Sequence, residues 1–200
     1  QIVGLASVGQ HPVSTRTRPA DQDARALSLA LNLHHKGIDG RVSLVHAGDP
    51  NEPSLRRYLG MGPESMTVIE QPEGADIVPA LASWLSNAEV DIVLAGMQAE
   101  RGEASGMVPY LLAEYLGWPL VSSVADIMRI DAPDQFVSPS ATEGRSDCKG
   151  IAHVLQALPR GQRRHIEVRL PFVATVSSSA HPPRQSVFGA EKRGNLDTVS

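Results

Sequence analysis

Residues 91–96, DIVLAG, lead through the loop 97–107, MQAERGEASGM, into residues 108–116, VPYLLAEYL, and this stretch decides the fold. The first segment is an apolar run of the length that a buried strand has, and the last is typical of a helix. A strand that passes through a glycine-containing loop into a helix is the building unit of parallel α/β sheets. The stretch therefore predicts one strand, one loop and one helix of such a sheet.

The same alternation of strand and helix precedes this stretch. The sequence first predicts a strand at 1–8 broken by Gly9, a turn-rich loop to residue 19 and a helix from Asp21 that Gly37 and Gly40 end. After these it predicts a strand at 41–47, a short helix at 55–59, a strand at 65–70 and a helix at 75–87. Strands separated by such helices cannot pair through tight hairpins, so they form a parallel sheet with right-handed crossovers. The predicted fold class is α/β, with a doubly wound, mostly parallel sheet.

The pattern changes after Pro119. Strands are predicted at 120–130, 153–157, 163–169 and 170–176, and a polar stretch at 131–149 without a helical pattern joins the first two. This part is expected to form an antiparallel appendage. The last residues are rich in serine, proline and charge, which predicts an extended C-terminal arm. We expect one α/β domain at 1–176, with a core at 1–119 and a strand-rich extension at 120–176, followed by the arm at 177–200.

The composition argues against several classes of protein. The 18 basic and 22 acidic residues give a net charge of −4, and the basic residues are scattered, so no nucleic-acid partner is expected. A single cysteine, Cys148, cannot form an intrachain disulfide, and no Cys/His metal spacing is present, so no metal site is expected. No apolar run is long enough for membrane insertion. We expect a cytoplasmic chain, or one of the mitochondrial matrix in a eukaryote.

Three glycine-marked strand ends are candidates for a ligand site, because open α/β sheets bind ligands at the carboxyl ends of their strands. They are Val8-Gly9, Ala47-Gly48 and Ala95-Gly96. The loop after the third is rich in small residues, which let backbone N–H groups and the positive end of a helix approach a phosphate. The lysine of a P-loop and the GxGxxG fingerprint are both missing. The loop is either a phosphate cradle or a plain connection.

Other polar residues have simpler structural explanations. His34-His35 is better explained as a partly solvated pair at a helix end than as a metal site. Asp21 and Asp23 could be catalytic carboxylates, but we favour helix capping for them. Neither a GxSxG elbow nor a recognisable nucleophile with its base is present, so we expect no catalytic residues in this chain.

Four segments, in the right order and spread over nearly the whole chain, together resemble the β subunit of electron-transfer flavoproteins. Residues 23–31 are similar to the D-x-x-A-L-x-x-A-L helix of that family, and residues 47–50 with 59–62 are similar to its CGP-type turn and its A-M-G-A-D stretch. Residues 91–99 are similar to D-x-V-L-x-G-x-Q-A, Pro109 with 112–114 to P-x-L-A-E, and 116–119 to L-G-W-P. Residues 170–176 are similar to L-P-A-V-V-T-V, with Pro183-Arg184 close behind.

The resemblance implies a nucleotide-binding domain of the adenine-nucleotide hydrolase-like type that works as a partner subunit and has no catalysis of its own. It would pair with an α subunit that carries the redox-active FAD and would itself hold AMP, or a second FAD in the bifurcating branch. Electrons would pass from a flavin-dependent dehydrogenase to that FAD and on to a quinone oxidoreductase. By position, the nucleotide contacts would be Ala6, Ala47, Gly48, Gln98, Ala99, Ser105, Gly106 and Met107.

The arm carries the family's recognition segment by the same resemblance. Counting from Pro183-Arg184, the apolar anchor that enters a pocket of the dehydrogenase falls on Phe188, with Val187 beside it. The alternative is that Phe188 pins the tail to its own subunit.

Some features depart from the family pattern and indicate a divergent branch. Arg101-Gly102-Glu103 stands where the family has D-G-D, Val8-Gly9-Gln10 replaces a basic pair, and the first loop has no aromatic residue.

Two other classes of function remain open. A stand-alone adenine-nucleotide-binding regulator similar to a universal stress protein would leave residues 116–119, 170–176 and the arm unexplained. An enzyme that adenylates or hydrolyses a small substrate would need a nucleophile or a metal cluster.

Overall fold

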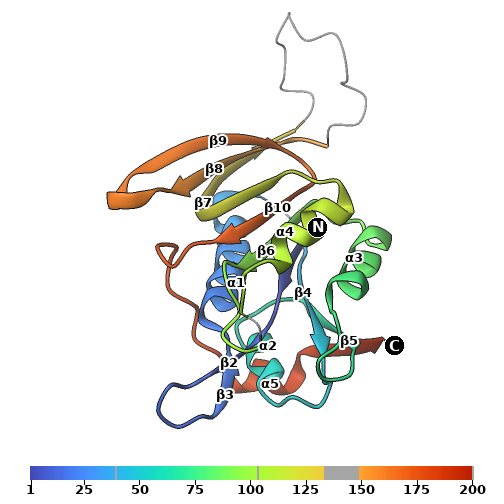
Figure 1. The fold of residues 1–200 in the computed structure, drawn as a ribbon. Coiled ribbons are helices and arrows are strands. Elements are labelled where there is room, and N and C mark those ends of the chain that lie inside the picture. Colours follow the sequence, from blue (N-terminus) through green and yellow to red (C-terminus); the bar gives the residue numbers. More distant parts are fainter. Residues whose placement is uncertain (39, 103, 133–148, 200) are drawn as a thin grey trace, which may run out of the picture.

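The computed structural model describes residues 1–38, 40–102, 104–132 and 149–199, and within these ranges the chain forms one nine-stranded sheet (Figure 1). Its strands are β1 (Ile2–Leu5), β4 (Val42–Gly48), β5 (Ser65–Glu70), β6 (Ile92–Gly96), β7 (Leu120–Asp131), β8 (Ile151–Ala157), β9 (Arg163–Arg169), β10 (Phe172–Val176) and β11 (Asn195–Val199). Their order across the sheet is β11-β5-β4-β1-β6-β10-β7-β8-β9. Pairing is parallel from β11 to β7 and antiparallel from β7 to β9. The predicted fold class is confirmed.

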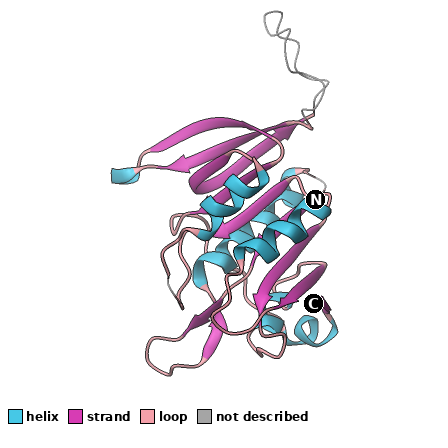
Figure 2. Ribbon diagram, turned by 45° about the vertical axis from the view of Figure 1, so that its right-hand side comes forward, coloured by secondary structure: helices cyan, strands magenta, loops and turns pink. Residues whose placement is uncertain are grey.

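Helices cover both faces of the parallel strands (Figure 2). One face packs against α1 (Asp21–Leu33) and α2 (Leu55–Leu59), and the other against α3 (Val78–Asn87) and α4 (Val108–Leu116). Side chains of β6 alternate between these layers, with Ile92 and Leu94 on the α1 side and Val93 on the other. Because the central strands are buried on both sides, they read as continuous apolar runs in the sequence.

The first strand differs from its prediction. The chain leaves the sheet after Ala6, whose N–H is the last to bond β4, because the Ser7 N–H donates to the Asp23 carboxylate instead. Val8–Gln10 (β2) then pairs antiparallel with Thr17–Pro19 (β3) in a separate hairpin. The predicted strand at 1–8 therefore ends at Leu5, a second strand runs through the predicted break at Gly9, and the predicted loop contains a third strand.

The helical stretch that begins with α1 ends at Gly37, as predicted, but it is not capped by an aspartate. Helix α1 itself stops at Leu33 and continues as a 3₁₀ turn, η1 (His34–Lys36), before Gly37 takes up a φ of 74°. Its N-cap is Ala20, without a side-chain hydrogen bond. Asp21 forms an ion pair with Arg25, with 2.8 Å between Oδ2 and Nε, so capping was the wrong prediction for Asp21 and Asp23.

The C-terminal arm lies along its own domain and then joins the sheet. The Arg184 N–H donates to Ser28 in α1, and the Ser186 hydroxyl donates to the Arg57 carbonyl in α2. Helix α5 (Phe188–Arg193) follows, and β11 pairs in parallel with β5 at the edge of the sheet. Neither α5 nor β11 was predicted from the sequence.

Within the predicted extension at 120–176, β7, β8 and β9 form an antiparallel layer that curves away from the parallel core (Figure 1). The prediction is wrong for β10, which lies in the parallel core between β6 and β7. Register shifts in β7 mark irregularities in its pairing with β8. Between β8 and β9 lies a 3₁₀ turn, η3 (Pro159–Gly161). Cys148 and most of the predicted polar stretch 131–149 fall outside the described residues. In the described part of the chain, no helix is long and apolar enough to cross a membrane.

Candidate functional site

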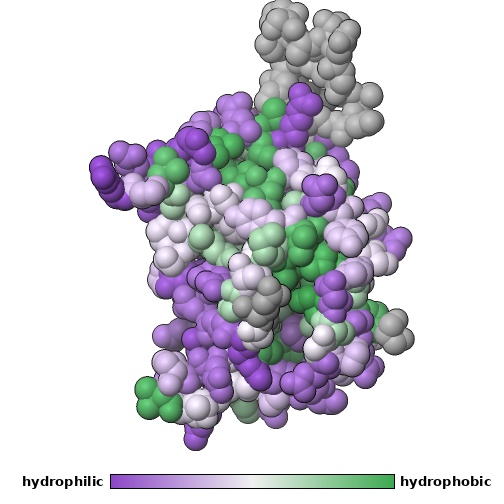
Figure 3. All heavy atoms as spheres, in the orientation of Figure 1, coloured by the Kyte–Doolittle hydropathy of each residue, from purple (hydrophilic) through white to green (hydrophobic). Residues whose placement is uncertain are grey.

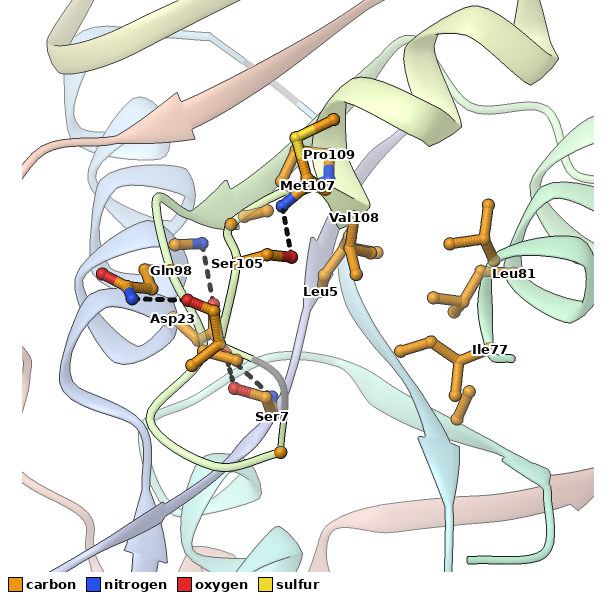
Figure 4. A pocket seen from close by; sticks show the side chains of 18 of the residues that line it. Leu5, Ser7, Asp23, Ile77, Leu81, Gln98, Ser105, Met107, Val108 and Pro109 are labelled. Carbon is orange, nitrogen blue, oxygen red and sulfur yellow. Dashed lines mark hydrogen bonds between the residues drawn. The ribbon is translucent and has the colours of Figure 1, made fainter. Parts of the chain in front are cut away.

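A pocket of about 670 Å³ opens at the carboxyl ends of β1, β4 and β6, between the starts of α3 and α4 (Figure 4). In the orientation of Figure 1, hydrophobic side chains gather on the surface between these two helices (Figure 3). All of the predicted nucleotide contacts except Gly48 line the pocket: Ala6, Ala47, Gln98, Ala99, Ser105, Gly106 and Met107. The structure thus brings residues from three distant parts of the sequence into one cavity.

The pocket has an apolar side and a polar side. Figure 4 shows Ile77 and Leu81 on one side, facing Ser105 and Gln98 across the cavity. Arg101 also contributes to the lining, which places a cation in the loop wall. Such a cavity suits a ligand with a flat apolar part and an anionic part.

The polar side is built by the loop between β6 and α4, which folds back on itself. Gln98 Nε2 donates to the Ala104 carbonyl, and the Met107 N–H lies 3.3 Å from Ser105 Oγ. Gly106 has a φ of +73°, and a Cβ there would lie 2.5 Å from the Met97 carbonyl oxygen. Only glycine fits this close approach, so the loop geometry depends on Gly106.

Helix α4 begins directly after the loop and gives the site its electrostatic character. The first N–H groups of a helix have no partner within the helix and carry a partial positive charge. The α4 start at Val108 and Pro109 forms part of the pocket lining. An anionic group in the pocket would therefore meet a favourable field.

Asp23 supports the site at the point where the sheet reverses its strand order. The chain moves outward from β1 through β4 to β5 and then returns to β6 on the other side of β1. One Asp23 oxygen accepts the Gly96 N–H at 2.7 Å, and the other accepts the Ser7 N–H at 2.8 Å and the Ser7 hydroxyl at 2.5 Å. One carboxylate therefore joins α1 to the ends of β1 and β6.

The electrostatics of Asp23 follow from its position. The residue is only 7% exposed, and this burial raises the pKa of the Asp23 carboxyl, while the hydrogen bonds from Ser7 and Gly96 act in the opposite direction. Gln22 supports the neighbouring loop in the same way, because its Oε1 accepts the Met97 N–H at 2.7 Å and the Gln98 N–H at 3.2 Å. The start of α1 thus holds the loop in place.

His46 is a pocket residue that the sequence analysis missed. Its ring is buried, and Nδ1 donates to the Ala6 carbonyl at 2.7 Å. Burial lowers the pKa of His46, so the imidazole is neutral at pH 7. A Cβ at Gly48 would lie 2.7 Å from His46 Nε2. Gly48 therefore leaves room for the histidine, although it does not line the pocket itself.

The other predicted sites lie elsewhere on the molecule. Val187 and Phe188 are 61% and 70% exposed at the start of α5, outside the pocket lining. His34 and His35 are exposed on the turn after α1, where His35 Nε2 lies 3.0 Å from the Arg184 guanidinium. This contact joins the arm to the turn η1.

The sheet is doubly wound, and its pocket of mixed character lies at the reversal point of the strand order, where α/β proteins of this class place their ligands. Residues 13–200 match the family model described as the electron transfer flavoprotein domain. The chain therefore belongs to the electron transfer flavoprotein family, among its β subunits.

Individual relatives agree with this assignment. The chain is 47% identical over 201 residues to electron transfer flavoprotein subunit beta of Chromohalobacter salexigens, an alignment that covers 99% of the chain and 67% of that protein. It is 31% identical over 184 residues to subunit beta of Mycobacterium tuberculosis, with 84% of the chain and 62% of the relative covered. The Bacillus subtilis subunit beta is 24% identical over 171 residues, with coverage of 82% and 65%. The chain thus spans about two thirds of the length of these relatives.

Proposed function

We propose that this chain acts in a heterodimeric electron-transfer flavoprotein, where its pocket binds AMP as a structural nucleotide and an α subunit carries most of the contacts to FAD. In this role it passes no protons and forms no covalent intermediate. Electrons move from a flavin-dependent dehydrogenase to the FAD and then to a quinone oxidoreductase, and this subunit holds and presents the cofactors.

The observation that carries the AMP proposal is the loop that turns back at Gly106 and delivers the chain into α4 beside an apolar wall. Ile77 and Leu81 line the apolar wall against which the adenine ring would pack, and the phosphate would lie at the loop and the helix start, where Arg101 also lines the pocket. The volume of about 670 Å³ lies in the range of small-molecule sites. The position of the pocket at the reversal point of the strand order supports the same ligand class.

An exposed apolar surface beside the pocket supports the proposed heterodimer. Large hydrophobic side chains of α4 and its loop are 38% to 64% exposed: Met97, Met107, Tyr110, Leu111 and Tyr115. Aromatic residues and methionine are enriched in protein interfaces, and apolar patches of this kind mark binding surfaces. We infer that the α subunit covers this surface and places its FAD near the mouth of the pocket.

The test of the proposed function is the ligand content of the purified complex. Co-expression with the α subunit is expected to yield a yellow one-to-one heterodimer in native mass spectrometry, and its denatured extract should contain one AMP and one FAD per heterodimer on chromatography. Two FAD molecules and no AMP would contradict the AMP assignment. A colourless homodimer that turns over ATP would favour the stress-protein-like regulator and contradict the proposal.

Phe188 provides a separate test of the proposed contact with the dehydrogenase. Phe188→Ala is expected to slow electron transfer from the dehydrogenase by roughly tenfold or more, because a buried aromatic anchor contributes at least about 2 kcal/mol to binding. Stopped-flow reduction of the bound FAD measures this rate. Val13→Ala is the matched control, since Val13 is an apolar side chain that is 85% exposed. Loss of FAD or AMP together with the rate would instead make Phe188 a structural residue of its own subunit.

A further inference from the structure

A cluster of polar side chains lies on the antiparallel extension, among residues outside the pocket lining. His153 in β8 stands directly opposite Glu167 in β9, and His165 lies two residues before Glu167, so all three project from one face of these strands. His153 Nδ1 is 3.0 Å from His165 Nε2 and 3.7 Å from Glu167 Oε1. The ligand atoms of all three residues lie within 4.8 Å of one another.

A carboxylate of β7 fixes the chemical state of His153. Asp131 Oδ2 lies 2.8 Å from His153 Nε2, and Arg129 Nη2 lies 3.2 Å from the same nitrogen. Because a carboxylate only accepts hydrogen bonds, the N–H of His153 is placed on Nε2 and donates to Asp131. The Nδ1 lone pair is therefore directed to His165 and Glu167. The Arg129 guanidinium, 3.3 Å from the same Asp131 oxygen, balances the charge of that carboxylate. His153 is 4% exposed, so its ring is held in place by its surroundings.

We propose that His153, His165 and Glu167 bind a divalent transition-metal ion such as Zn²⁺. Ligand atoms that surround such an ion at about 2.0–2.2 Å lie roughly 3 to 4 Å apart. The 3.0 Å between His153 Nδ1 and His165 Nε2 and the 3.7 Å between His153 Nδ1 and Glu167 Oε1 are close to this spacing. The two imidazole ligands select this class of metal over Mg²⁺ or Ca²⁺, which prefer oxygen ligands alone. The second nitrogen of a metal-binding histidine often donates a hydrogen bond to a carboxylate that orients the ring, and Asp131 occupies that place at His153.

The arrangement leaves the metal accessible and links two strands. His165 and Glu167 are exposed on the outer strand, whereas His153 is buried. Water would complete the coordination, and the ion would join β8 to β9 away from the pocket. No metal site is expected from the sequence, because these ligands do not follow a Cys/His spacing. They meet only through the register of the β8–β9 hairpin, which pairs His153 with Glu167.

Zinc titration of the full, untagged, EDTA-treated chain tests this site. Isothermal titration calorimetry is expected to show one Zn²⁺ per chain, with the affinity reduced at least about tenfold in His165→Ala and in Glu167→Gln. Asp131→Asn, a change in a positioning residue, should weaken binding by about tenfold. Zn²⁺ should also raise the melting temperature of the wild type and leave that of His165→Ala unchanged, because only a folded site binds the ion.

His181→Ala is the matched control, because His181 is an exposed histidine of the arm that takes no part in the cluster. This variant should bind Zn²⁺ as the wild type does. The proposal is overturned if the wild type does not bind Zn²⁺ at millimolar concentration, or if His165→Ala and Glu167→Gln bind it with wild-type affinity. Loss of binding in a variant with both His34 and His35 replaced would also overturn it, since that result places the ion on the turn after α1.

Discussion

Replacing Asp23 with alanine is expected to lower the free energy of unfolding by about 3 kcal/mol, because buried hydrogen-bond donors that lose their acceptor each cost about 1 to 3 kcal/mol. The Ser7 N–H and the Gly96 N–H both donate to this carboxylate. Without it, the ends of β1 and β6 are no longer tied to α1 beneath the pocket. We therefore expect the variant to lose its bound nucleotide as well as stability. Urea denaturation and the AMP content of the purified protein measure the two effects.

Two further variants separate the role of the carboxylate from the effect of a change at the start of α1. Asp23→Asn keeps the size of the side chain but places an NH₂ group against one of the donating N–H groups, so it should lose about 1 to 3 kcal/mol. Asp21→Ala removes only an ion pair between consecutive turns of α1, with its aspartate partly exposed, and should change stability by less than about 0.5 kcal/mol. Equal stability of Asp21→Ala and Asp23→Ala would contradict the structural role assigned to Asp23.

The parallel core could be predicted from the sequence because its strands are buried on both faces and its helices have one apolar face. The predicted limits of β5, β9 and α4 agree with the structure at both ends. The edge strand β11 could not be recognised in this way. Its residues, NLDTV, are mostly exposed and show no apolar run, and the strand forms only because β5 offers an unpaired edge.

The pocket could be predicted in outline, whereas its supporting side chains could not. Glycines at the ends of β4 and β6 marked the right edge of the sheet, since parallel strands end there together. Asp23 was misassigned because an aspartate near a helix start has the same sequence signature whether it caps the helix or bonds to distant strands. His46 was missed because it lies within a buried apolar strand, and its bond to Ala6 depends on strand pairing.

Gly106→Ala is expected to reduce the affinity for AMP roughly 30-fold, which corresponds to about 2 kcal/mol. The new methyl group would lie 2.5 Å from the Met97 carbonyl oxygen, so the backbone of the loop must move. That movement displaces the N–H groups at the loop and the start of α4, where the phosphate is proposed to bind. Calorimetric titration of nucleotide-free protein with AMP measures the change.

Gly102→Ala isolates this contact from the conformational effect of adding a side chain. Gly102 and Gly106 lie in the same loop and share a φ of +73°, so alanine at either position carries a similar penalty of about 1 kcal/mol for the left-handed backbone. Among the described residues, no atom lies within 4 Å of a Cβ placed at Gly102. Gly102→Ala should therefore keep its AMP affinity within about twofold of the wild type, a difference of less than about 0.5 kcal/mol. The two positions differ in the close approach to Met97. If both variants lose affinity for AMP equally, that contact does not determine nucleotide binding, and flexibility of the loop rather than its folded shape does.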